Sequence, residues 1–175
     1  MRSFLIQCKG WMTTVLNGAL ILAVFLLVMD VVWGVFTRYV MGEQAKWTEE
    51  LARFLLIWIT LLGGAVAFGT KGHLGVDYFV EKFDPRMRKG MAVIVHGIVL
   101  FFAGAIFVFG GWRVATHTLA LGQTTAALPI KMGVVYFALP ISGVFMILYT
   151  LENLVETLNT PATDLPDTTI GEETD

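Results

Sequence analysis

This sequence has few charged residues and only one cysteine. Asp, Glu, Lys and Arg make up 15% of its 175 residues, whereas a soluble domain usually has about 25%. Cys8 is the single cysteine, which excludes an internal disulfide and a cysteine-ligated metal cluster. The net charge of −2 gives no reason to expect nucleic-acid binding. HExxH, GxSxG and Walker motifs are also missing, so we predict that the chain is not an enzyme and needs no cofactor.

The three histidines are poorly placed to bind haem or a metal. A bis-histidine haem requires two histidines at one depth on facing helices. His96 and His117 fall on or beside one predicted helix, about 30 Å apart along its axis, and His73 is expected at a membrane surface. A membrane anchor for a redox enzyme is therefore a rival hypothesis that needs a haem absorbance to support it.

Long apolar stretches are what the sequence does contain. It is 56% hydrophobic, with a mean hydropathy of +0.72. A helix needs about 20 apolar residues to cross about 30 Å of hydrocarbon. We therefore predict an all-α integral membrane protein whose residues 1–160 form one four-helix transmembrane domain. The expected spans are residues 13–39, 46–70, 85–115 and 129–156.

Two further segments lie outside the predicted spans. Val76, Phe79, Val80 and Phe83 recur at the spacing of one helix face. This pattern predicts a short interfacial amphipathic helix at about residues 75–83, with an ordinary loop as the alternative. Residues 161–175 are acidic and rich in Thr and Pro, which predicts a disordered tail.

The distribution of Lys and Arg predicts the orientation in the membrane. Seven of these residues fall on the side that holds both termini and the connection between the second and third spans, and five on the other side. Because short cytoplasmic segments carry the excess of positive charge, we expect both termini in the cytoplasm.

Glycine recurs every seven residues along the third span, at Gly90, Gly97, Gly104 and Gly111. A seven-residue period keeps one narrow seam facing a neighbouring helix, and glycine on that seam lets two backbones approach closely. The spacing predicts a helix-packing seam, although glycine is common enough in membrane helices for chance to be the alternative.

Asp30 lies well inside the first span. An intramembrane acid raises a functional hypothesis by default, such as a proton or sodium relay, and a self-contained channel or exporter could use it as a coupling acid. The structural alternative is a hydrogen bond across the first helical hairpin, where a turn centred near residue 44 would place Trp58 level with Asp30.

Six charged residues fall between Arg38 and Phe54, at the connection of the first two spans. Arg38 and Glu50 are expected to pair across the hairpin, and Glu49 and Arg53 have the i, i+4 spacing of a helical ion pair. Apolar residues on another side of the second helix form a stripe that predicts a partner-facing surface. The candidate interface or clamp consists of Arg38, Trp47, Glu49, Glu50, Leu51, Arg53, Phe54 and Trp58.

These residues also carry a family resemblance. The order Arg38-Tyr39, Trp47-Thr48-Glu49-Glu50, Arg53, Trp58, Gly63-Gly64 and His73-Leu74-Gly75-Val76-Asp77 resembles the small membrane subunit of TRAP transporters, the tripartite ATP-independent periplasmic transporters. The resemblance covers about residues 30–89 and continues more weakly through Leu128-Pro129 and Leu139-Pro140. Ile130-Lys131-Met132 departs from the pattern, which would have an aromatic residue soon after Leu-Pro.

The resemblance implies a role rather than a reaction. In this family a large membrane subunit carries the sodium and substrate sites, and a periplasmic binding protein delivers an organic acid such as a C4-dicarboxylate or sialic acid. The resemblance therefore implies an auxiliary subunit in the bacterial inner membrane that packs against the large permease subunit and lipid. It would hold neither substrate nor sodium itself.

Overall fold

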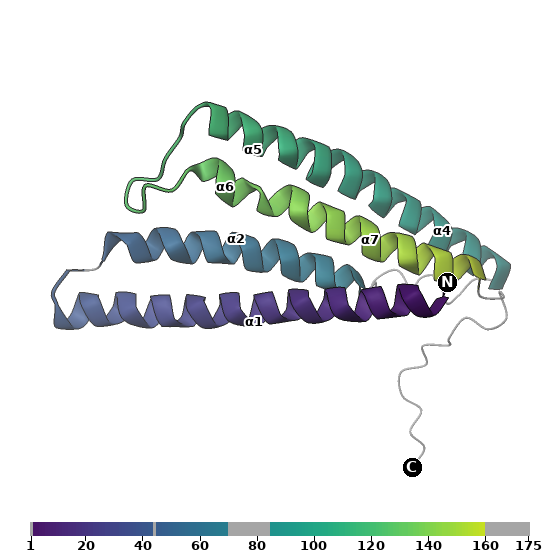
Figure 1. Ribbon diagram of the computed structural model, residues 1–175, viewed down its shortest axis with the longest axis horizontal. Helices are drawn as coiled ribbons and strands as arrows, with labels where there is room; N and C mark the ends of the chain where they lie inside the picture. The colour runs from purple at the N-terminus through teal and green to yellow at the C-terminus, as the bar shows by residue number, and fades with distance from the viewer. Residues whose placement is uncertain (1, 44, 70–84, 160–175) are drawn as a thin grey trace, which may run out of the picture.

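The computed structural model describes residues 2–43, 45–69 and 85–159, and all of its named elements are helices (Figure 1). They are α1 (Arg2–Val40), α2 (Lys46–Gly69), α4 (Pro85–Phe102), the π-helix η1 (Ala103–Gly110), α5 (Gly111–Ala120), α6 (Met132–Tyr136) and α7 (Ala138–Asn159). The predicted interfacial helix and the predicted disordered tail lie outside the described residues.

Four helical stretches are long and apolar enough to cross a membrane. They cover Gly10–Val40, Lys46–Gly69, Lys89–Ala120 and Met132–Asn159, so α4, η1 and α5 form one span and α6 and α7 another. The prediction of an all-α fold with four transmembrane helices is confirmed.

The spans form two helical hairpins that lie side by side (Figure 1). α1 pairs with α2 in the first hairpin, and α6 and α7 run back along α4, η1 and α5 in the second; α2 and α7 join the two. The start of α1 and the end of α7 lie at one end of the bundle. The turn after α1 and the loop after α5 lie at the other, which we name the loop end. Toward the loop end the two hairpins diverge (Figure 1).

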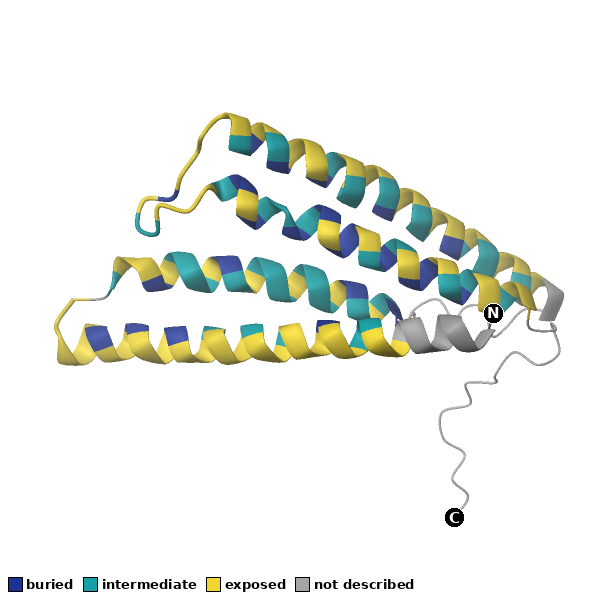
Figure 2. Cartoon of the chain, in the orientation of Figure 1, coloured by how far each residue is buried: buried dark blue, intermediate teal, exposed yellow. Residues whose placement is uncertain are grey.

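The first helix contacts its neighbour through one narrow buried stripe. Leu16, Asp30, Gly34 and Thr37 are buried on α1, and their spacing follows a seven-residue period. Most of the remaining surface of α1 is exposed (Figure 2). An apolar helix with so little of its surface covered needs lipid or another protein around it.

A short polar turn joins α1 to α2. The Thr37 side chain closes it, because its hydroxyl donates to the Gly34 carbonyl at 3.0 Å and accepts the Ala45 backbone N–H at 3.3 Å. Gly42 lies in this turn with φ +80°, a conformation in which a Cβ would be strained.

The predicted glycine seam is wrong for three of its four members. A Cβ added at Gly90, Gly97 or Gly104 would meet nothing within 4 Å, whereas one at Gly111 would lie 2.7 Å from the Leu139 Cβ. The π-helical segment explains the difference, because its wider turns interrupt the seven-residue phase just before Gly111.

Glycines that the seven-residue pattern did not indicate make further close contacts in the second hairpin. A Cβ at Gly143 would lie 2.6 Å from the Phe107 Cβ, and one at Gly133 would lie 2.7 Å from the Ala115 carbonyl oxygen. α6 and α7 therefore approach η1 and α5 closely, through glycine, as expected for helix packing in lipid.

Candidate functional site

Glu50 joins the two hairpins at the loop end. It lies in the first turns of α2, and its carboxylate accepts hydrogen bonds from two consecutive backbone N–H groups of the loop between α5 and α6. The Ala127 N–H lies 3.1 Å from each carboxylate oxygen, and the Leu128 N–H lies 3.0 Å from Oε2. Successive backbone N–H groups that converge in this way form a cradle for an anion.

The local structure of the α5–α6 loop presents these N–H groups. The Thr125 N–H donates to the Ile130 carbonyl and the Met132 N–H to the Gln123 carbonyl, each at 3.0 Å. These bonds fold the loop into a narrow hairpin with residues 126–129 at its tip. Because the tip reaches α2, the loop bridges the gap where the hairpins diverge.

The predicted Arg38–Glu50 pair is wrong. In the part of the chain that the structure describes, the acceptors of Glu50 are taken by loop amides, and no ion pair joins it to Arg38. Glu49 and Arg53 are both exposed, and these described side chains also form no ion pair with each other. At an exposed surface such a pair would contribute little in any case.

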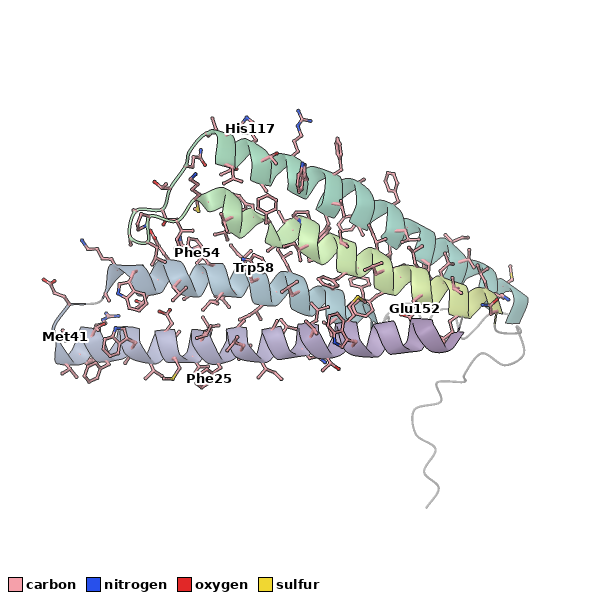
Figure 3. The ribbon with its side chains drawn as sticks, viewed as in Figure 1. Phe25, Met41, Phe54, Trp58, His117 and Glu152 are labelled. Atoms are coloured by element: carbon pink, nitrogen blue, oxygen red, sulfur yellow. The ribbon has the colours of Figure 1, made fainter. Side chains whose placement is uncertain are left out.

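The predicted apolar stripe on α2 consists of Trp47, Leu51, Phe54 and Trp58, and these side chains differ in their exposure. Phe54 is buried, with 7% exposure. Leu51, Phe54 and Trp58 line a cavity of about 440 Å³ between α1, α2 and α6, and Figure 3 shows Phe54 and Trp58 in the space between α2 and α6. Trp47 is 38% exposed, which makes it the most accessible of the four to a partner, since Leu51 and Trp58 are half-buried.

The predicted hydrogen bond between Asp30 and Trp58 is also wrong. Asp30 is 5% exposed, and neither of its carboxylate oxygens has a hydrogen-bond partner among the described residues. It shares a pocket with Ala52, which lies six residues before Trp58, or about 9 Å along the helix axis. The actual register of the hairpin therefore differs from the one estimated from a turn centred near residue 44.

Within the described residues, His, Cys, Asp and Glu do not gather in groups of three or more. His96 contacts its own helix, with Nδ1 2.6 Å from the Ala92 carbonyl oxygen. The main polar features toward the loop end are the Glu50 contact, the pocket beside Asp30 and the exposed charges of Arg38, Glu49 and Arg53.

Comparison with known proteins identifies the family of this chain. Residues 27–160 match the DctQ component of tripartite ATP-independent periplasmic transporters. The chain belongs to this family. The match includes the fourth span, where Ile130-Lys131-Met132 departed from the expected pattern, and it identifies a component of a transporter. Together with the four apolar helices, it makes the chain a multi-pass membrane protein.

Individual relatives of this DctQ-family chain differ in length. It is 30% identical over 122 residues to the sialic acid TRAP transporter small permease protein of Vibrio cholerae, covering 70% of this chain and 69% of the relative. It is 27% identical over 105 residues to the C4-dicarboxylate small permease protein of Rhodobacter capsulatus, covering 60% and 46%. It is 25% identical over 153 residues to a sialic acid TRAP transporter permease protein of Haemophilus influenzae, covering 87% of this chain but 24% of that longer protein.

Sequence reasoning found the acid at the centre of the loop-end contact but not its partners. Glu50 and Leu128-Pro129 both belong to the family resemblance, which is the one signal that connects the two segments. A backbone N–H donor, however, leaves no trace in residue identity, because every residue except proline supplies one.

Proposed function

We propose that this chain is the small auxiliary membrane subunit of a sodium-coupled TRAP transporter for an organic acid of the C4-dicarboxylate or sialic acid type. It packs against the large permease subunit and stabilises the fixed scaffold of that subunit. The family match over residues 27–160 carries the proposal. In the longer Haemophilus influenzae relative, the matching region occupies only 24% of the permease protein, which supports a large membrane partner for the shorter chains.

The distribution of apolar surface supports a partner rather than a self-contained channel. In the most apolar part of each of the first three spans, 11% of the residues are buried inside the chain, against 44% in the fourth. Large exposed patches of this kind mark lipid or protein contacts. The exposed Trp47, close to the charged turn at the loop end, is suited to anchor such a contact because buried aromatic residues often dominate interfaces.

The orientation in this proposal rests on the distribution of Lys and Arg, seven against five. With both termini in the cytoplasm of a bacterium, the loop end faces the periplasm. The Glu50 contact and the exposed charges of Arg38, Glu49 and Arg53 would then lie on the side from which a periplasmic binding protein delivers its substrate. The sodium ions would bind to the large subunit.

The test is co-purification followed by transport. This chain, tagged, is co-expressed with a large TRAP permease subunit from the same organism, and the complex is reconstituted into liposomes with the binding protein under an imposed sodium gradient. Trp47→Ala should leave the chain inserted but reduce both the recovered large subunit and the uptake, by about tenfold or more if Trp47 is a central anchor. The matched control is Trp11→Ala, because Trp11 is also exposed but lies in the half of α1 away from the loop end.

Three results would count against the proposal. Full uptake without any complex would remove the auxiliary role. Uptake by this chain alone would favour the self-contained channel or exporter. Uptake lost while the complex stays intact would mean that the chain acts directly in transport or in receiving the binding protein.

A further inference from the structure

Asp30 is a buried acid without a partner in a membrane helix. Its 5% exposure and its two unpaired oxygens leave a carboxylate that the described residues do not compensate. Buried polar groups are almost always hydrogen-bonded, and intramembrane acids usually pair with another group. The position therefore calls for a donor from outside these residues.

A pocket is present where such a donor would have to bind. About 280 Å³ in volume, it is formed between α1 and α2 and lined by Asp30, Gly34, Arg38, Glu49 and Ala52 among others. The small residues Gly34 and Ala52 leave space beside the carboxylate. A cavity of about 150 Å³ already admits benzene, so this pocket can hold the end of a long side chain.

The pocket can be reached from the surface of the chain. Val31 and Val35 also line it, and their side chains are 50% and 52% exposed. Its ionisable lining consists of two acids, Asp30 and Glu49, two basic or phenolic groups, Arg38 and Tyr39, and no other titratable residue. With Asp30 ionised by a partner, Asp30 and Glu49 against Arg38 give the lining a net charge of −1, which complements a single positive charge.

Arg38, the basic residue that lines the pocket, makes no ion pair with Asp30 in the described part of the chain. Arg38 follows Asp30 by eight residues, or about 12 Å along the axis of α1, which places it at the rim of the pocket at the loop end. Glu49 lies in the first turn of α2, at the same end. None of the described residues supplies the donor that Asp30 lacks, whereas a side chain of another molecule could.

We propose that this pocket binds one positively charged side chain, a lysine or an arginine, of the large membrane subunit, with Asp30 as the counter-charge. The inference rests on the proposed function, because it needs that partner. Lysine supplies three N–H donors and arginine five, and their apolar stems can lie along Val31 and Val35 while the charged end enters the pocket. A metal ion is less suited, because it prefers several oxygen ligands and the described acids do not cluster here in threes.

The test compares three variants of the small subunit in the complete complex. Asp30→Asn keeps the size of the side chain but removes its charge, Asp30→Glu keeps the charge, and Asp30→Lys reverses it. At equal amounts of inserted small subunit, Asp30→Asn should weaken association with the large subunit by about 30-fold or more. Asp30→Glu should retain a large part of the association, and Asp30→Lys should lose it.

A charge exchange identifies the partner and separates the proposal from a folding defect. Each intramembrane Lys and Arg of the large subunit is replaced by Asp in turn and co-expressed with the Asp30→Lys small subunit. One of these replacements should restore both the complex and the uptake, which a merely misfolded variant would not allow.

The outcomes distinguish this inference from the proposed function. If the wild-type chain does not bind the large subunit, the proposed function itself fails. If wild-type and Asp30→Asn chains bind equally well, the function stands and the inference is wrong. An intact Asp30→Asn complex with altered sodium dependence would assign the pocket to a sodium ion and also overturn the inference. So would the failure of every charge exchange to restore the complex.

Discussion

Replacing Gly143 with alanine puts a methyl carbon into the contact between α7 and η1. The new Cβ would lie 2.6 Å from the Phe107 Cβ, 3.0 Å from the Val108 Cγ2 and 3.2 Å from the Val108 backbone nitrogen. Carbon atoms pack at about 3.5–4.0 Å, so the helices must separate by about 1 Å. The Phe107 Cβ cannot move aside alone, because it is attached directly to the backbone.

The expected cost follows from two opposing effects. Overpacking a well-filled interior destabilises a protein by about 1–3 kcal/mol, while replacing glycine with alanine favours the helix by up to about 1 kcal/mol. The short Cβ–Cβ separation puts the overpacking cost toward the upper end of its range, so the net loss should be about 1–2 kcal/mol. For a chain of this size, that change lowers Tm by about 2–8 °C, measured by tryptophan fluorescence in one detergent at one protein concentration.

Gly97→Ala is the matched control, because it lies on the predicted glycine seam of the third span and its added Cβ would meet nothing within 4 Å. Its Tm should stay unchanged or rise, since only the gain in helix propensity remains. Equal losses at Gly97 and Gly143 would restore the seven-residue seam, and an unchanged Tm for Gly143→Ala would refute the close contact between α7 and η1.

Two further predictions concern the loop end. Glu50→Gln removes the charge that holds the loop amides, so the peptide covering residues 123–131 should exchange its amide hydrogens faster. The control Arg53→Gln, at an exposed position of the same helix, should leave this exchange rate unchanged. Equal exchange rates in the two variants would contradict the Glu50 contact. For the orientation, single cysteines at the exposed positions Met41 and Leu121 in a Cys8→Ser background should react with an impermeant thiol reagent added outside intact cells with a permeabilised outer membrane. Labelling of both only after the inner membrane is opened would reverse the proposed topology.

The sequence by itself determined the architecture of this protein. Four apolar stretches of about 20 residues or more predict four spanning helices, because in lipid a helix satisfies all of its backbone polar groups within the segment. It also determined that the connection of the first two spans is unusually charged, and the order of residues around Trp47 and Glu50 was enough to indicate the family. These properties are local in the chain.

The tertiary structure decided which of those residues meet. Glu50 binds backbone N–H groups of Ala127 and Leu128 rather than Arg38, because the distant loop folds back between diverging hairpins. Asp30 lies beside Ala52 rather than Trp58, since a register estimated from one assumed turn centre carries its error along the whole hairpin. The π-helix interrupted the seven-residue repeat of glycines, because a few residues in wider turns change which of the later residues face the neighbouring helix.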